Sequence, residues 1–401
     1  MADIRRTWRQ IVSAALLPLA AGALLISACA SAQPIQVTNI LNPSIAGKAG
    51  NFDVVEIDQA NHRLYVADRA GGVDVFDITG APAKYLQTIS LPAPPNGLAI
   101  APDLGRLFVG ISNGSVLFVD INPASATVYT VVKDVPTGGK SADLLDYAAK
   151  PHLVFASNGI EGTLATIDAV TGELKAPIKV GFALEQPRFN PADGMLYVTS
   201  PDADGLFQID PKDGKIKQKV PLGGCLPAGM AINPKSQVLI ACRAAVIMWD
   251  LGSAKSAGFD RVTGGDVVSY DAKTDRFFVA APQKTGPSAV GIFGGSPIAY
   301  IASVPTAGAG KSTAYDETND ILYTPDDRLG YAGLAGFHPP VEAQFIYPSV
   351  ASVGIFAAVV VVILLLFVFV GRGADPILRV EPEPRPRRSR SAAPAGGEVK
   401  T

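Results

Sequence analysis

Histidine is scarce in this sequence, and its scarcity argues against several kinds of catalytic site. The only histidines are His62, His152 and His338, and no two of them have the spacing of metal ligands. A histidine-ligated zinc or haem site is therefore not expected. A Ser-His-Asp triad would need one of the three, but two of them fall in predicted turns and His338 precedes two prolines. We expect no such triad.

The central part of the chain also lacks an excess of positive charge. The whole sequence has a formal charge of −2, of which residues 1–34 contribute +2 and residues 371–401 contribute +3. Residues 35–370 therefore carry −7. A mildly acidic body without a basic stripe argues against nucleic acid as a partner.

Long apolar runs are absent except at the two ends. Residues 1–32 combine three arginines with an uncharged run over residues 11–26 and then small residues, which is the pattern of a secretory signal peptide. Three alternatives stay open for this segment. It is cleaved after Ala32, it is lipidated at Cys29 of a lipobox-like Ile-Ser-Ala-Cys, or it stays as an uncleaved anchor. All three export the residues that follow.

The second apolar run extends from Val350 to Val370. Its 21 residues would span about 30 Å as a helix, the thickness of a hydrocarbon core. The run predicts a transmembrane helix over residues 348–371. The tail, residues 372–401, is rich in proline and arginine, so we expect it to be disordered and cytoplasmic. This topology places the body, residues 33–341, on the periplasmic or cell-surface side of the membrane.

Cysteine is rare as well. Apart from Cys29, only Cys225 and Cys242 occur. A predicted hairpin that turns near residues 233–237 would place Cys242 opposite about residue 228, and hence close to Cys225. A disulfide is one interpretation for an exported protein, and two buried free thiols are the other.

Glycine and proline are abundant, with 40 and 32 residues, which indicates many turns rather than long helices. One pattern recurs: an apolar strand, a turn rich in Asp, Asn or Pro, and a second strand of the type Leu-Tyr-Val. Its copies occupy residues 53–68, 96–110, 141–157, 185–200, 228–242, 266–281 and 311–326. Equivalent positions in consecutive copies lie 43, 46, 43, 43, 38 and 45 residues apart. Seven such units predict an all-β fold, a seven-bladed β-propeller.

Each unit continues with a third strand that tends to end in an apolar residue and an aspartate, as at Phe76-Asp77 and Trp249-Asp250. We interpret these aspartates as structural residues that hydrogen-bond their own turns. A ring must also close, because an open sheet edge invites aggregation. Residues 34–41 have strand character but belong to no unit, so we predict that they form the outermost strand of the seventh blade.

The second strands read RLYVAD, RLFVG, MLYVTS and RFFVAA, and they resemble the YVTN-type repeats of bacterial exported seven-bladed propellers. The resemblance covers about residues 50–337 and implies both the fold and export. It implies no particular activity, because this family is known mainly as a scaffold. The predicted C-terminal membrane helix is a departure from the family pattern.

In a propeller the inner strands converge on a central channel, and a concave polar mouth is the expected place for a ligand. We take the inner strands to end at residues 58, 101, 146, 190, 233, 271 and 316, so that the residue five positions earlier lies at this mouth. Those positions hold Asp53, Asn96, Ser141, Glu185, Ala228, Asp266 and Lys311. Contact with water in the channel would by itself explain why six of the seven are polar.

Two functions follow from these residues. The first is a non-enzymatic scaffold that binds an unidentified protein or small-molecule ligand on the propeller face and needs no cofactor. The alternative resembles the propeller lactonases: Asp53, Glu185 and Asp266 would hold Ca²⁺ or Mg²⁺, which polarises an ester carbonyl. In either case Lys311 would pair with a carboxylate at the rim.

One motif predicts no function. Gly310-Lys311-Ser312 resembles the end of a phosphate-binding loop, but Pro305 stands where that loop needs its first glycine. Residues 135–147 contain a similar stretch, which marks the segment as part of the repeat. We therefore predict no nucleotide binding here.

Overall fold

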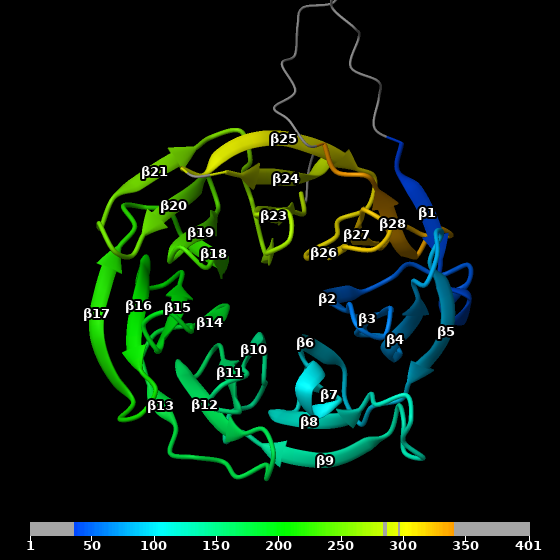
Figure 1. Ribbon diagram of the computed structural model, residues 1–401, viewed down its shortest axis with the longest axis horizontal. Helices are drawn as coiled ribbons and strands as arrows, with labels where there is room; N and C mark the ends of the chain where they lie inside the picture. The colour runs from blue at the N-terminus through cyan, green and yellow to red at the C-terminus, as the bar shows by residue number, and fades with distance from the viewer. Residues whose placement is uncertain (1–35, 284–286, 296, 341–401) are drawn as a thin grey trace, which may run out of the picture. The chain divides into compact units, whose positions relative to one another are not determined.

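The computed structural model describes residues 36–283, 287–295 and 297–340. These residues form seven four-stranded antiparallel sheets, arranged as blades around a central axis (Figure 1). The predicted all-β, seven-bladed propeller is confirmed. The predicted signal segment, membrane helix and cytoplasmic tail lie outside the described residues. Among the residues that are described, no helix has the length and apolar character needed to cross a membrane.

The first three blades follow one another along the chain, each from the channel outwards. Blade 1 contains β2 (Phe52–Asp58), β3 (Arg63–Asp68), β4 (Gly72–Asp77) and β5 (Lys84–Ile89). Blade 2 contains β6 (Pro95–Ala101), β7 (Arg106–Ile111), β8 (Ser115–Asp120) and β9 (Val131–Pro136). Blade 3 contains β10 (Leu145–Ala148), β11 (Leu153–Asn158), β12 (Thr163–Asp168) and β13 (Ile178–Lys179). Two short 3₁₀ helices, η1 (Pro43–Ile45) and η2 (Pro102–Leu104), lie in connections.

The next three blades repeat the same order. Blade 4 contains β14 (Pro187–Asn190), β15 (Met195–Ser200), β16 (Gly205–Asp210) and β17 (Lys215–Pro221). Blade 5 contains β18 (Pro227–Ile232), β19 (Gln237–Cys242), β20 (Val246–Asp250) and β21 (Ser256–Phe259). Blade 6 contains β22 (Val268–Asp271), β23 (Arg276–Ala281), β24 (Ser288–Gly294) and β25 (Ala299–Thr306).

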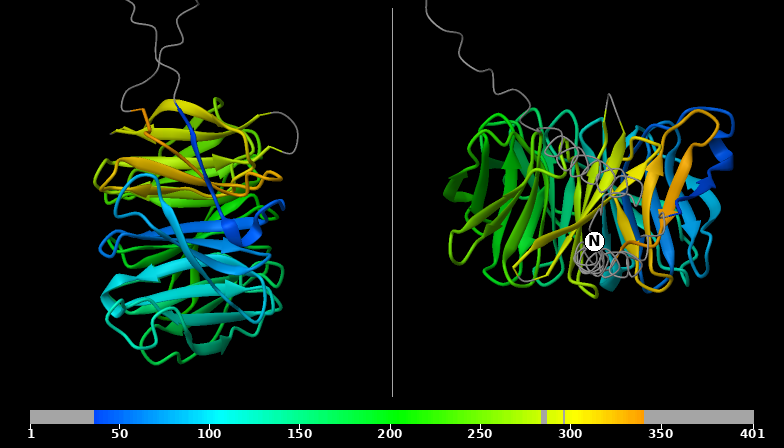
Figure 2. Two further views of the ribbon diagram at one scale, coloured as in Figure 1. Left: turned by 90° about the vertical axis from the view of Figure 1, so that its right-hand side faces the viewer. Right: turned by 90° about the horizontal axis from the view of Figure 1, so that it is seen from above.

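Blade 7 joins the two ends of the described chain. It contains β26 (Ala314–Asp316), β27 (Ile321–Asp326), β28 (Gly333–Phe337) and β1 (Thr38–Leu41). Strand β1 pairs antiparallel with β28, with Ile40 opposite Leu334, so the predicted outermost strand of the seventh blade is confirmed for Thr38–Leu41. In both side views of Figure 2 the blue first strand lies beside the orange last strands.

The amino-acid pattern of each strand follows its distance from the channel. The second strands are nearly continuous apolar runs, because both faces of a blade pack against neighbouring blades; in β3 every residue after Arg63 is buried. The outer strands are amphipathic, and β17 exposes all of its residues except Val220. Strand position in the blade therefore explains why the Leu-Tyr-Val strands are the strongest repeat signal.

The aspartates that end the third strands bind their own turns, as predicted. Asp168 accepts hydrogen bonds from the N–H groups of Val170 and Thr171 at 3.0 and 2.7 Å. The turn closes at Gly172, whose φ of 71° lies in the left-handed region that glycine adopts readily. Asp250 makes the equivalent bonds to residues 252 and 253, so the Trp-Asp pair belongs to this turn pattern.

The hydrophobic core is divided among the junctions between blades. Each of the seven neighbouring pairs, including blade 7 with blade 1, shares its own cluster of buried apolar side chains. The blade 7 to blade 1 cluster includes Ile40, Val66 and Leu334. Because every blade packs on two neighbours, residues at the channel are held on a rigid frame.

Candidate functional site

Four of the residues predicted at the channel mouth line one cavity. Asp53 lies at the start of β2, and Glu185, Asp266 and Lys311 each lie two or three residues before an inner strand. Together with neighbouring side chains they line a cavity of about 470 Å³. Its lining is Asp53, Arg69, Asp143, Leu144, Glu185, Asp266, Val267 and Lys311. We call this cavity the channel mouth.

Ser141, which was predicted at the mouth, does not line this cavity, whereas Asp143 of the same blade does. The inner strand of the third blade ends at Ala148 and not at Asp146, so the residue five positions before its end is Asp143. Ser141 is absent from the lining of the cavity and accepts a hydrogen bond of 3.0 Å from Asn96 Nδ2. The mouth therefore contains four carboxyl groups, one more than the sequence predicted.

Asn96 is a buried connector behind the mouth, with 2% of its surface exposed. Its Nδ2 donates to the Ala142 carbonyl at 2.8 Å as well as to Ser141, which ties blade 2 to blade 3. Its Oδ1 accepts a hydrogen bond from Arg69 Nη1. Asn96 is thus a positioning residue for Arg69 and does not line the cavity.

Arg69 is a second charged mouth residue, besides Asp143, that sequence reasoning missed. It follows β3, in the turn to β4, and donates to Asp53 Oδ2 at 3.0 Å. In an antiparallel hairpin the second strand ends at the edge where the first begins. Strand pairing therefore places the Arg-Ala-Gly-Gly turn near Asp53. It does not determine the direction in which a side chain of the turn points.

The positive charges are unevenly shared among the four carboxyl groups. Asp53 is 8% exposed and has both cationic partners, since Lys311 Nζ also lies 3.6 Å from its Oδ2. Burial raises the pKa of Asp53, and the charges of Lys311 and Arg69 oppose that rise. No hydrogen bond or ion pair from a described residue reaches the carboxyl oxygens of Asp143, Glu185 or Asp266.

The three carboxyl groups without a partner have strongly raised pKa values. Burial, followed by the charges of Asp143 and Asp266, raises the pKa of Glu185 to about 8. Burial and the charge of Asp53 raise the pKa values of Asp143 and Asp266 to about 6 each. With these pKa values Glu185 is mostly protonated at neutral pH and the other two are mostly ionised, so an incoming positive charge would displace about one proton.

A larger cavity of about 920 Å³ adjoins the mouth, because Glu185, Asp266 and Lys311 line both. Part of its wall is apolar and is formed by Pro201, Leu226, Pro227, Ala228 and Pro282. We call this cavity the side groove. Charge in the mouth and apolar surface in the groove make a combined site that suits a ligand with both kinds of group.

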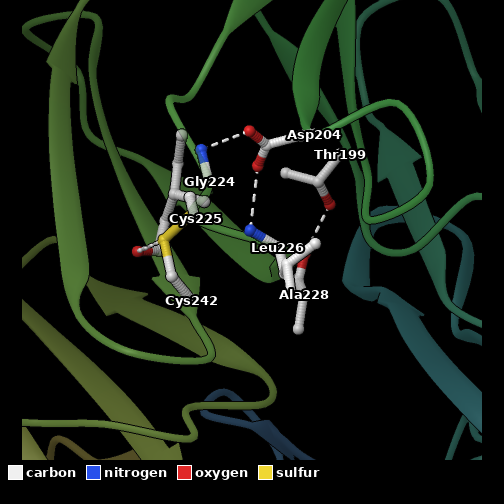
Figure 3. The surroundings of a disulfide bond; sticks show 8 residues. Thr199, Asp204, Gly224, Cys225, Leu226, Ala228 and Cys242 are labelled. Atoms are coloured by element: carbon white, nitrogen blue, oxygen red, sulfur yellow. Dashed lines mark hydrogen bonds between the residues drawn. A yellow bond between two sulfur atoms is a disulfide. The ribbon is translucent and has the colours of Figure 1, made fainter.

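The groove loop that contains Leu226 is fixed at several points (Figure 3). Cys225 and Cys242 form a disulfide, the pair that the hairpin geometry brought together. The Asp204 carboxylate accepts hydrogen bonds from the N–H groups of Gly224 and Leu226, the second at 2.9 Å. Leu226 has a φ of 51°, which is uncommon outside glycine. These contacts keep a leucine that is 39% exposed in the groove wall.

Ser312 has a structural role. Its Oγ donates to the Asp53 carbonyl at 2.7 Å and accepts from the Val55 N–H at 2.9 Å, so it joins blade 7 to blade 1. The residue is fully buried. This agrees with the prediction that the Gly-Lys-Ser stretch belongs to the repeat and not to a phosphate-binding loop.

The residues predicted for a divalent cation share a cavity without forming a metal-binding group. Asp53, Glu185 and Asp266 come from three blades and line the mouth together. Within residues 36–283, 287–295 and 297–340, no three His, Cys, Asp or Glu side chains are grouped so that they could hold a metal ion.

No protein-family model and no curated protein matches this chain in sequence. Its fold is similar to a chain of Kuenenia stuttgartiensis hydrazine synthase, with a TM-score of 0.61 and 12% identity over 76% of this chain and 100% of that one. It is also similar to a chain in the crystal structure of the mitotic checkpoint complex, with a TM-score of 0.61 and 13% identity over 77% and 92% of the two chains. At such low identity these similarities show the propeller fold alone.

Proposed function

We propose that this chain is a membrane-anchored, extracytoplasmic propeller that acts as a non-enzymatic binding scaffold. Its ligand would place a basic group in the channel mouth and an apolar part in the side groove. The observation that supports this proposal is the set of three half-buried carboxyl groups at Asp143, Glu185 and Asp266, which lack hydrogen-bond and ion-pair partners among the described residues. A bound cation would supply the missing charge.

The lining of the two cavities favours binding over catalysis. None of the described residues that line the mouth or the side groove is Ser, Thr, Cys or His, the residue types most often used as nucleophile or proton shuttle. What the cavities offer is charge, apolar surface and fixed geometry. The interblade clusters and the disulfide hold that geometry before a ligand arrives, which reduces the entropic cost of binding.

The proposed location rests on the sequence ends. A signal-like segment at residues 1–32 and a predicted membrane helix at residues 348–371 would tether the propeller outside the cytoplasm. The disulfide is consistent with an oxidising compartment. We also propose that this chain is related to the exported YVTN-type propellers.

The proposal can be tested by calorimetric titration of the full-length chain in detergent. The probe is the blocked tripeptide acetyl-Gly-Arg-Gly-amide, with acetyl-Gly-Glu-Gly-amide as the charge-reversed control. We expect the arginine peptide to bind and the glutamate peptide not to bind. The double variant Asp143→Asn/Glu185→Gln should weaken binding at least about tenfold.

An exposed glutamate provides the matched control for this titration. Glu173→Gln makes the same chemical change at an exposed turn residue between β12 and β13, and should leave binding unchanged. Equal binding of both peptides, or full binding by the double variant, would reject the mouth as the site. Hydrolysis of a lactone that requires added Ca²⁺ or Mg²⁺ and disappears in Glu185→Gln would favour the hydrolase alternative.

A further inference from the structure

A second set of charged residues lies further along the inner strands, away from the mouth. It contains Glu56, Asp146 and Arg188, each three residues after a mouth residue on the same chain segment. Three residues of extended strand correspond to about 10 Å. These side chains line a separate cavity of about 320 Å³, which shares no residue with the mouth cavity. We call it the inner cavity.

Arg188 and Asp146 satisfy each other in this cavity. Arg188 Nη1 lies 3.4 Å from Asp146 Oδ1 and also donates to the carbonyl groups of Leu145 and Pro187 at 3.0 and 3.2 Å. The other carboxylate oxygen of Asp146 accepts the Phe189 N–H at 2.6 Å. The charges of Arg188 and Asp146 therefore offset each other, and the hydrogen bonds of the pair connect blades 3 and 4.

Glu56 is the charge that remains. Its carboxyl group receives no hydrogen bond and no ion pair from any residue that the structure describes. A second cavity of about 300 Å³ adjoins the inner one, with Glu56, Ser269 and Tyr270 lining both. Glu56 therefore lies between two cavities and lines both.

The walls around Glu56 combine polar groups with apolar and aromatic side chains. The inner cavity is lined in part by Ala99, Ile100, Phe189, Ala231 and Ile232. Small-molecule sites in proteins occupy about 300–1,000 Å³, so the inner cavity is of a size for a small ligand. A single free carboxylate is too few ligands for a metal ion, which needs several oxygens.

We propose that the inner cavity binds a small organic monocation, an ammonium group with a short apolar chain, and that Glu56 is its charge partner. The apolar chain would pack on Phe189 and the alanines of blades 2 and 5. This site is independent of the proposed function at the mouth.

Binding should depend on pH, because burial and the charge of Asp146 raise the pKa of Glu56 to about 7 against the effect of Arg188. Besides these two, the titratable groups that face the two cavities are Tyr147, Tyr270, Asp271, Tyr315 and Glu317. A cation binds the ionised carboxylate, so affinity should rise as Glu56 loses its proton. Ionisation of a group with a pKa near 7 increases about tenfold between pH 6 and pH 8, and the apparent affinity should increase by the same factor.

The test is calorimetry of the full-length chain in detergent with n-butylammonium chloride. The probe should bind about tenfold more tightly at pH 8 than at pH 6, whereas n-butanol and sodium butyrate of equal size should not bind. Glu56→Gln should weaken butylammonium binding at least about tenfold and abolish its pH dependence. Its thermal transition should stay close to that of the parent chain, which shows that the variant is folded.

Two further variants keep the proposal falsifiable. Ala99→Leu fills the inner cavity without changing charge and should also remove the binding that depends on Glu56, whereas Glu173→Gln at an exposed position should retain it. Loss of binding in Glu185→Gln but not in Glu56→Gln would assign the cation to the mouth and overturn the inference. Tighter binding of butyrate than of butylammonium would assign the cavity to anions at Arg188 and overturn it as well.

Discussion

Lys311 Nζ lies 3.6 Å from Asp53 Oδ2, across the junction between the last blade and the first. The next residue along the chain, Ser312, bonds the Asp53 backbone. The contact that closes the ring is therefore also a wall of the channel mouth. Ring closure and the charge balance of the site depend on the same two segments.

Replacing Lys311 with methionine should increase the affinity of the mouth for a basic peptide. The substitution removes one of two cations from a cavity with four carboxyl groups, so an incoming arginine meets less repulsion. We expect acetyl-Gly-Arg-Gly-amide to bind about threefold to tenfold more tightly, as measured by calorimetry. Weaker binding would mean that Lys311 itself recognises the ligand, and would point to an anion.

The raised pKa of Glu185 predicts how stability changes with pH. The folded state holds a proton up to about pH 8, whereas the unfolded chain loses it near its ordinary value of about 4.3. Protonation therefore stabilises the folded state fully below the unfolded pKa, and this contribution is lost as pH rises towards 8. Glu185→Gln removes the titration, so its unfolding free energy should decline less, by on the order of 4 kcal/mol, between pH 5 and pH 8.5.

Thermal unfolding at several pH values measures this difference. Other buried carboxyl groups, including Glu56 and Asp74 with pKa values of about 7, contribute a decline in both chains. The comparison with Glu173→Gln, an exposed position, isolates Glu185. Parallel curves for the parent and Glu185→Gln would show that the mouth does not hold this proton.

Two alanine substitutions in β1 test how much the closing strand contributes to the free energy of unfolding. Ile40 is 8% exposed and packs in the cluster between blades 7 and 1, whereas Leu41 next to it is 55% exposed. Ile40→Ala should lower the free energy of unfolding by about 3 kcal/mol, and Leu41→Ala by about 0.5 kcal/mol or less. Denaturant unfolding measures both. Equal effects would mean that β1 does not close the ring.

The disulfide should stabilise the propeller measurably. Cys225 and Cys242 are separated by 17 residues, a loop whose closure in the unfolded chain is worth about 3 kcal/mol. The variant Cys225→Ala/Cys242→Ala should unfold at lower temperature than the parent, and reductant should have no further effect on the variant. If thiol titration of the denatured, unreduced parent finds both residues as free thiols, the disulfide is absent.

Divalent cations should have little effect on stability. Because no described group of carboxylates has metal-binding geometry, millimolar Ca²⁺ or Mg²⁺ should not raise the melting temperature above that in EDTA at matched ionic strength. An ion that binds only the native state must raise it. A clear rise that Glu185→Gln abolishes would favour the hydrolase alternative.

Much of the fold could be predicted from the sequence, because burial on both faces makes the second strands conspicuous. The last residue of an inner strand was harder to predict from the sequence. In most blades an aspartate or asparagine ends that strand and binds the following turn, as Asp58 and Asn190 do. Asp146 lies two residues before its strand ends and bonds the Phe189 N–H of the next blade instead. Because an aspartate ends other inner strands, the sequence predicts that Asp146 ends this one. Counting five residues back from it gives Ser141 in place of Asp143.

The pKa values and the division of the channel into two cavities were beyond sequence reasoning for a different reason. Both depend on which side chains from separate blades face each other. Arg69 donates to Asp53 on its own blade and also to Asn96 on the next blade. Such relations between distant segments appear only once the ring is assembled.

The most direct test of the proposed mouth is the number of protons released when a basic ligand binds. Calorimetry of acetyl-Gly-Arg-Gly-amide at pH 7, in two buffers of different ionisation enthalpy, measures that number for the full-length chain. With the pKa of Glu185 at about 8, a bound guanidinium should displace close to one proton, and Glu185→Gln should displace almost none. Binding without proton release in the parent chain would contradict the account.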